Sequence, residues 1–207
     1  PLFMKLEFTK LIDKYGLKPP ADIPAAEEPV DLTVTAEAVT TVEKAKEYAR
    51  IESELSHFRD GIWGAQAVAA AVAVAMVDGT IEEIIDAAME AIPEESWLYH
   101  NMTEAFRILE SNNGNLLDSW MELHDCLRTS AWATTAEAIP SAFACLKAVN
   151  DDFRKGVIVA GNFGRDADTI GAVAGAILGA KYGAGKMPER WIEKTRYPSG
   201  TCLQFTK

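Results

Sequence analysis

Residues 157–182 read VIVAGNFGRDADTIGAVAGAILGAKY, and the interpretation of the whole chain starts from this stretch. A glycine-containing loop over residues 161–165 leads into two carboxylates and a hydroxyl, Asp166, Asp168 and Thr169. Carboxylate and hydroxyl oxygens are the hard ligands that Mg²⁺, Mn²⁺ and Ca²⁺ prefer. The stretch therefore predicts a metal site at the start of the next helix, which Asp166 or Asp168 is also placed to cap.

The helix predicted over residues 169–183 has a glycine at every fourth position, at Gly171, Gly175, Gly179 and Gly183. Each glycine inside a helix costs about 1 kcal/mol of helix propensity relative to alanine. Close approach of another backbone would offset this cost. We expect that partner to be the alanine-rich helix predicted over residues 64–77, so that these two helices form the centre of the domain.

Apolar residues recur at helical spacing along most of the chain. Further helices are predicted over residues 1–16, 36–55, 80–91, 94–111, 116–128 and 142–149. Pro140 fits the first turn of the last of these or a kink in a longer helix. Residues 157–160 fit a strand or a helix by pattern alone, and we predict a helix because no other segment is a convincing strand.

The predicted fold is therefore an all-α bundle of roughly eight or more helices. Four of the nine prolines lie in residues 17–34, which predicts an extended connector. We accordingly divide the chain into residues 1–34, an N-terminal helix with its connector, and residues 35–207, the helical domain. Trp97, Phe106, Trp120 and Leu127 are assigned to its core, and His100 and His124 to helices without a metal role.

Composition excludes several classes of partner. A chain of 207 residues can bury a sizeable core, and its formal net charge of −11 argues against a nucleic-acid partner. The most apolar runs, residues 64–77 and 170–182, are shorter than the ~20 residues that cross a bilayer. Three cysteines, Cys126, Cys145 and Cys202, have neither zinc spacing nor a disulfide framework. We therefore expect reduced thiols and a cytoplasmic protein.

The sequence resembles the ADP-ribosylglycohydrolase family over approximately residues 43–191. Its C-terminal signature is similar to GNFGRDADTIGAVAGAILGAKYG at 161–183 followed by MPERW at 187–191, and a second matching piece is SHFRDG at 56–61. The resemblance implies that Asp166, Asp168 and Thr169 bind a pair of Mg²⁺ ions, with Mn²⁺ as an alternative, which hold the ribose of ADP-ribose. It also implies that His57 lies against the bound ADP-ribose.

Two further sets of residues are candidates for ligand contact. Gly161, Asn162 and Gly164 offer backbone amides, and Phe163 an aromatic face, for a diphosphate or adenine, although loop packing explains Phe163 equally well. His57 either touches the ligand, with Asp60 accepting from one ring nitrogen, or caps the helix before it.

The segment before residue 142 has two readings as well. The resemblance places Thr134, Thr135 and Glu137 near the metal loop, and a helix-capping arrangement explains them equally well.

The sequence departs from the family in one respect. Members carry a Thr-Asp-Asp motif that supplies further metal ligands, and this sequence has none; Asp151 and Asp152 follow an asparagine in another part of the chain. Two carboxylates do not neutralise two Mg²⁺ ions, each of which needs about six oxygen ligands. We therefore expect the catalytic residues in an N-terminal part that this chain lacks, or in a second chain.

The expected function is that of a Mg²⁺-dependent hydrolase that cleaves the N- or O-glycosidic bond between ADP-ribose and a protein side chain. The alternatives are a catalytically incomplete relative that binds a ligand or a partner, and an enzyme of the same fold with another substrate. A nucleotide-binding α/β fold is disfavoured because the chain lacks Gly-Lys-Ser/Thr and Gly-x-Gly-x-x-Gly.

Overall fold

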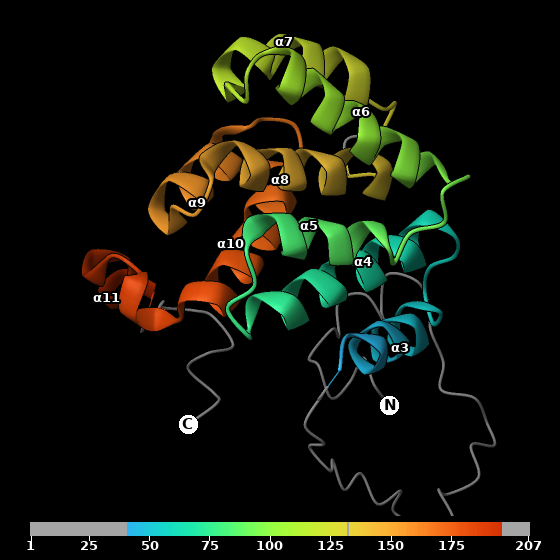
Figure 1. Cartoon of the computed structure of the whole chain (residues 1–207), viewed down its shortest axis with the longest axis horizontal. Coiled ribbons are helices and arrows are strands. Elements are labelled where there is room, and N and C mark those ends of the chain that lie inside the picture. Colours follow the sequence, from blue (N-terminus) through green and yellow to red (C-terminus); the bar gives the residue numbers. More distant parts are fainter. Residues whose placement is uncertain (1–40, 132, 196–207) are drawn as a thin grey trace, which may run out of the picture. The chain divides into compact units, whose positions relative to one another are not determined.

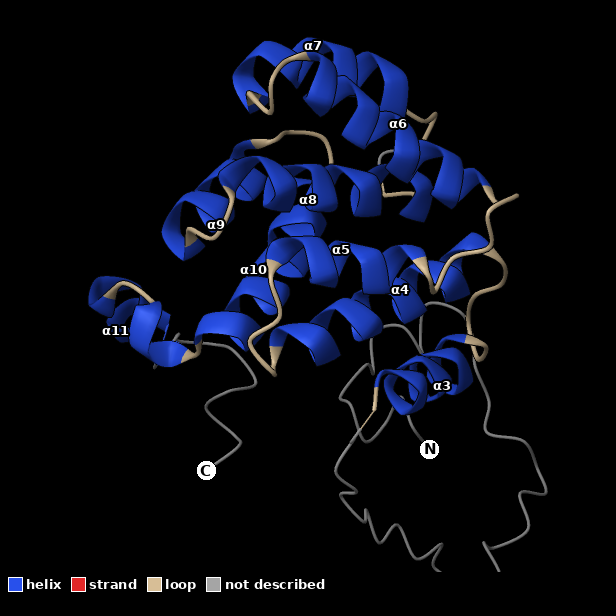
Figure 2. Cartoon of the chain, viewed as in Figure 1, coloured by secondary structure: helices blue, strands red, loops and turns tan. Residues whose placement is uncertain are grey.

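The computed structural model of the chain describes residues 41–131 and 133–195, which form nine α-helices and one short 3-10 helix (Figure 1). This part of the chain contains no strand (Figure 2), so the all-α prediction is confirmed. The predicted helix at 1–16, the connector at 17–34 and residues 197–205 lie outside the described residues. The predicted domain boundary after residue 34 stays a prediction.

The elements run from α3 to α11. They are α3 (Val42–Ser53), α4 (Asp60–Ala75), α5 (Ile81–Met89), α6 (Trp97–Ser111), α7 (Leu116–Leu127), α8 (Thr135–Val149), α9 (Phe153–Asn162), α10 (Ala167–Tyr182), η1 (Ala184–Lys186) and α11 (Glu189–Thr195). Local chemistry explains several ends. Thr80 and Glu83 form a reciprocal capping box at the start of α5, and Gly183, with φ of +64°, ends α10. Residues 157–160 lie within α9, as predicted.

Helix α8 occupies the centre of the described part. Twelve of its fifteen residues are buried, against five of sixteen in α4 and four of sixteen in α10. Figure 1 shows α6 and α7 on one side of α8 and α4, α5 and α10 on the other. The expectation that α4 and α10 form the centre is therefore wrong. A helix that is apolar on all sides, as α8 nearly is, belongs in a core.

Pro140 lies inside α8, so the longer-helix alternative is the correct one. A proline has no N–H to donate to the carbonyl four residues earlier, which here belongs to Ala136. The buried side chain of Asn101, on α6, donates to that carbonyl oxygen at 2.6 Å. A neighbouring helix thus supplies the hydrogen bond that the proline removes.

Two glycines of α10, Gly171 and Gly175, face α9 rather than α4, whereas Gly179 lies against Met187. A Cβ atom built on Gly171 would lie 3.6 Å from Cα of Gly161, so the backbone approach is confirmed there, although its partner is α9. A Cβ on Gly175 would meet the side chain of Val157 at 3.9 Å. Helix α4 packs against α10 as well, but the glycines are not its contact surface.

A lysine joins the C-terminal ends of α4 and α10. The ammonium of Lys181, whose side chain is 7% exposed, lies 3.2 Å from an Asp78 carboxylate oxygen and donates to the Gly79 carbonyl at 2.9 Å. Asp151, in the α8–α9 turn, is 3.6 Å away. Because α4 and α10 pack together and end at the same place, they run parallel, and both begin at the opposite end.

Three of the four large side chains assigned to the core contribute to it. Leu127 is buried and Phe106 and Trp120 pack against the core, as predicted, whereas Trp97 at the start of α6 is exposed and that prediction is wrong. Among the residues described, no helix combines the length and apolar character needed to cross a bilayer.

We predict that Asn101→Leu lowers the free energy of unfolding by about 1–3 kcal/mol, because it leaves the buried Ala136 carbonyl without a donor. Pro140→Ala restores a backbone N–H at that place, so the same substitution should cost less in a Pro140→Ala background. Urea unfolding of the two single variants and the double variant measures the difference. If Asn101→Leu lowered the free energy of unfolding equally in both backgrounds, the Asn101 side chain would not be replacing the N–H that Pro140 lacks.

Candidate metal and ligand site

The three predicted metal ligands lie together at the start of α10. Asp166 is the N-cap residue and is half-buried, while Asp168 and Thr169 lie in the first turn and are exposed. Their side chains form no hydrogen bond or ion pair with any described residue, so the predicted capping hydrogen bond is absent. The start of a helix favours negative charge, and these oxygens are available to another ligand.

The donor set fits one side of a metal site. Two carboxylates and a hydroxyl are suitable hard donors for Mg²⁺, but they supply half of the roughly six oxygens that one ion needs. Within residues 41–131 and 133–195, no group of three His, Cys, Asp or Glu side chains is placed to hold a metal ion. The described residues therefore do not complete the site.

The turn before α10 has a strained backbone. Gly164 has φ of +94° and Arg165 has φ of +55°, a region that side-chain-bearing residues rarely occupy. Such a residue costs of order 1–3 kcal/mol and persists where its surroundings hold it. We call residues 163–166 the metal loop.

Glu137, near the start of α8, holds Arg165. The glutamate is 3% exposed and accepts from Arg165 Nε at 2.5 Å and Nη2 at 2.9 Å. Thr129 donates to it through both its backbone N–H and its hydroxyl, each at 2.8 Å. Burial alone would raise the pKa of Glu137, but the hydrogen bonds from Arg165 and Thr129 outweigh burial and lower that pKa.

The segment at the start of α8 was expected either to lie near the metal loop or to cap its own helix. Thr134 is the N-cap residue of α8 but its side chain makes no capping hydrogen bond; its hydroxyl pairs with that of Thr129 at 2.8 Å. Glu137 reaches the metal loop through Arg165, so the alternative that brings this segment to the site holds for Glu137. The sequence does not indicate the pair of Glu137 with Arg165, because an ion pair between residues 28 positions apart leaves no local pattern.

A cluster of aromatic rings covers the other side of the metal loop. His124 on α7 lies 2.7 Å, through Nε2, from the Phe163 carbonyl oxygen, and its ring stacks on the Phe163 ring at 4.5 Å. The Trp120 ring lies 5.0 Å from that of Phe163. Phe163 is 3% exposed, which supports loop packing rather than an aromatic face for a ligand. His124 is a helix histidine with a protein partner, as predicted.

Gly161 and Asn162 are not loop residues. They form the last turn of α9, where the helical hydrogen-bond pattern uses their amides, and the Asn162 side chain donates to the Ile158 carbonyl at 2.7 Å. The glycine at 161 instead allows α10 to approach α9. The amides of Gly164, Arg165 and Asp166 form no hydrogen bond with the described residues, so these are the free donors of the turn.

His57 is exposed in the connection between α3 and α4. Its Nδ1 lies 2.8 Å from the Ser56 hydroxyl, and among described residues its ring contacts no carbonyl of α3. The expected hydrogen bond with Asp60 is absent; the Asp60 carboxylate instead accepts from the Leu98 amide at 2.9 Å. The ring therefore has no capping role and is open to a ligand.

The start of α8 links the His57 segment to the metal loop. A Cβ on Gly64, in the second turn of α4, would lie 2.3 Å from the Thr135 methyl, so α4 and α8 touch there. Two residues further along α8, Glu137 binds Arg165 of the metal loop. The starts of α4, α8 and α10 thus lie at one end of the described part, and His57 and the predicted metal ligands lie at that end.

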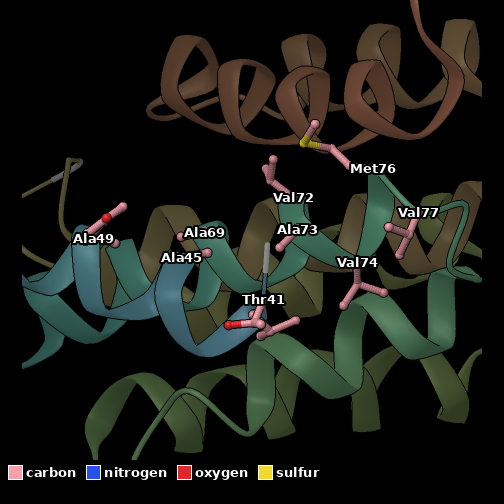
Figure 3. Close-up of a pocket in the computed structure, with 11 residues that line it drawn as sticks. Thr41, Ala45, Ala49, Ala69, Val72, Ala73, Val74, Met76 and Val77 are labelled. Atoms are coloured by element: carbon pink, nitrogen blue, oxygen red, sulfur yellow. The ribbon is translucent and has the colours of Figure 1, made fainter. Parts of the chain in front are cut away.

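A cavity of about 640 Å³ lies elsewhere, between α3 and the C-terminal half of α4 (Figure 3). Its lining is formed by Thr41, Val42, Ala45, Tyr48, Ala49, Ala69, Val72, Ala73, Val74, Met76 and Val77. Among the residues that the structure describes, this lining contains no carboxylate, histidine or basic residue. It therefore lacks the groups for metal binding or hydrolysis, and the cluster at the start of α10 is the better candidate.

Comparison with known proteins gives related sequences. The ADP-ribosylglycohydrolase family model matches residues 29–206. An uncharacterized protein of Archaeoglobus fulgidus is 32% identical over 148 residues, which cover 70% of this chain and 45% of that protein. The ADP-ribosylarginine hydrolase Tri1 of Serratia proteamaculans is 31% identical over 103 residues, 49% of this chain and 26% of that protein.

A third relative is the ADP-ribosyl-[dinitrogen reductase] glycohydrolase of Rhodospirillum rubrum, 46% identical over 46 residues, which cover 22% of this chain and 16% of that protein. No solved structure matches the chain. The chain spans less than half of the length of each of these relatives. Since the family model covers most of the chain and agrees with the all-α fold, this chain belongs to the ADP-ribosylglycohydrolase family.

Proposed function

We propose that this chain forms one side of a Mg²⁺-dependent hydrolase site that releases ADP-ribose from a protein side chain. The observation that carries the proposal is the set of free oxygens of Asp166, Asp168 and Thr169 at the start of α10. The names of the Serratia and Rhodospirillum relatives describe hydrolases of ADP-ribosylated targets, which supports the reaction class.

Each group of the site has a distinct proposed task. Asp166, Asp168 and Thr169 hold the metal, which when bound holds the ribose hydroxyls and stabilises negative charge that develops on oxygen. The free amides of Gly164, Arg165 and Asp166 bind the diphosphate, because successive N–H groups in a left-handed turn form an anion-binding concavity. His57, with its exposed ring, contacts the ribose or the diphosphate.

The remaining ligands and the groups that attack the anomeric carbon are proposed to come from outside this cluster. Two carboxylates leave the charge of two Mg²⁺ ions uncompensated, and the described residues offer no third acidic ligand nearby. A segment or second chain with the family's Thr-Asp-Asp motif would supply them. We also propose a cytoplasmic location, in keeping with the free thiols of Cys126 and Cys145.

The incomplete donor set also favours a second candidate, a relative that binds ADP-ribose without turning it over. The two functions differ in their product. Release of free ADP-ribose from an ADP-ribosylated protein supports the hydrolase, and binding of ADP-ribose without release supports the binding protein.

We predict that Asp168→Ala weakens Mg²⁺ binding by at least about tenfold, or about 1.4 kcal/mol, because it removes a carboxylate ligand. Isothermal titration with Mg²⁺ measures this for the chain alone and together with a polypeptide that carries the Thr-Asp-Asp motif, and binding should be tight only in the second case. Asp118→Ala is the matched control, since Asp118 is the first-turn acid of α7. Equal affinity of the wild type and Asp168→Ala would end the metal assignment.

We predict that His57→Ala weakens ADP-ribose binding while Mg²⁺ affinity and thermal stability stay nearly unchanged. The reason is that, among the described residues, the ring hydrogen-bonds only with Ser56 and makes no hydrogen bond with a helix end. Titration of ADP-ribose and a thermal melt measure the two effects, with the exposed His100→Ala on α6 as control. A loss of about 1 kcal/mol of stability, as loss of a helix cap produces, with unchanged ligand affinity would assign His57 a structural role instead.

We predict that Glu137→Gln lowers the free energy of unfolding by roughly 2 kcal/mol near neutral pH, less than for a fully buried pair because the Arg165 side chain is 26% exposed. The folded-state pKa of Glu137 is lowered, so its contribution is complete above the ordinary glutamate pKa and is lost as pH falls through the lowered folded value. The difference between variant and wild type should therefore shrink in acid.

Urea unfolding across the acidic range measures this difference. The control is Glu110→Gln, whose exposed carboxylate lies 3.7 Å from Lys147. That variant should change stability by less than about 0.5 kcal/mol at any pH. A Glu137→Gln difference that does not depend on pH would show that the ion pair is not its source.

A further inference from the structure

We propose that α7 positions the metal loop, and that His124 is the positioning residue through which it acts. The inference rests on the proposed function, because it concerns the geometry of the same metal site. It assigns a task to a histidine that carries no metal or catalytic role in the sequence or in the proposed reaction.

The contact between His124 and Phe163 restrains both the backbone and the side chain of the loop. Since a carbonyl oxygen only accepts, His124 Nε2 carries the proton of the 2.7 Å hydrogen bond. The two rings are nearly parallel, with an interplanar angle of 17°. A Cβ on Gly164 would lie 3.5 Å from His124 Cε1, so the histidine also lies against the next residue of the loop.

Trp120 supports this contact from one turn earlier on α7. Residues four apart on a helix lie on the same face, and the Trp120 ring is 5.8 Å from that of His124 and 5.0 Å from that of Phe163. The rings of Trp120 and His124 both pack on Phe163, which is buried. The aromatic side of the loop is therefore built by α7 and by Phe163 alone among the residues described.

The loop is held on two sides by two different helices. His124 of α7 holds Phe163, and Glu137 of α8 holds Arg165. Between them lies Gly164, whose φ of +94° lets the chain turn toward α10. Asp166 directly follows Arg165, so the two contacts set where the first predicted ligand points. Metal ligands need placement within about 0.5 Å, and a loosened loop should bind metal more weakly.

Two substitutions separate the hydrogen bond from packing. His124→Gln keeps an amide N–H near the position of Nε2, whereas His124→Leu keeps apolar volume and removes the donor. The first readout does not involve metal: it is the NMR order parameters of the backbone amides of Gly164, Arg165 and Asp166. The second is Mg²⁺ affinity by isothermal titration with the Thr-Asp-Asp polypeptide. His100→Leu, at an exposed position on α6, is the control.

We expect order parameters near 0.85 in wild type and His124→Gln, and below about 0.6 in His124→Leu, the values of rigid and flexible backbone. Mg²⁺ affinity should fall at least about fivefold in His124→Leu and stay near wild type in His124→Gln. A long-range ¹H–¹⁵N spectrum should show the Nε2–H tautomer. The melting temperature should change little.

Rigid amides in both variants, or equal loosening in both, would overturn the assignment, because the Nε2–H donor would then not matter. If wild type binds no Mg²⁺ under any condition, the proposed function fails. The order parameters still decide whether His124 positions the loop, so the two failures are distinguishable. A His124→Leu protein that loses its fold is recognised by its melt, and His124→Asn, whose shorter amide cannot reach the Phe163 carbonyl, then replaces it with the same expected loosening.

Discussion

The ion pair between the buried Glu137 and the partly exposed Arg165 is the contact on which the geometry of the candidate site depends. It joins the central helix α8 to the turn that begins α10. A buried carboxylate is costly unless its charge is paired and its oxygens are hydrogen-bonded, and Glu137 meets both conditions with donors from Arg165 and Thr129. The planar guanidinium binds through two nitrogens, which fixes direction as well as distance. That direction holds Arg165 at its positive φ.

The same pair explains why the predicted metal ligands are free. Arg165 is the one basic residue in the stretch 161–169, and it precedes Asp166 directly. Because its guanidinium is bound to Glu137 and to the Thr129 carbonyl, it does not neutralise Asp166 or Asp168. The negative charge at the start of α10 is therefore not neutralised by this neighbouring arginine.

The central position of α8 allows one helix to organise the site. Its first turns contact α4 at Gly64 and the metal loop at Arg165, so the starts of three helices meet at one end. At the other end Lys181 joins the C-terminal ends of α4 and α10. The cost of an all-round buried helix is that its polar atoms must find partners inside the protein. Asn101 provides one such partner, since its side chain donates a hydrogen bond to the Ala136 carbonyl that Pro140 leaves without a donor.

The sequence by itself determined the all-α class, most helix positions and the residues predicted to bind metal, because helical periodicity, capping residues and the Asp-Ala-Asp-Thr motif are local patterns. The count of available ligands also led to the prediction that Asp166, Asp168 and Thr169 supply only part of a metal site. It placed Gly161 and Asn162 in a loop, because a glycine near a helix end resembles a break when its packing partner is unknown.

Only the tertiary structure decided that α8 is central, that Gly171 and Gly175 of α10 face α9, and that Phe163 packs on His124. The pairs that hold the metal loop, Glu137 with Arg165 and His124 with Phe163, are 28 and 39 residues apart. Such contacts depend on how whole helices pack, and the spacing of residues within one helix does not predict them.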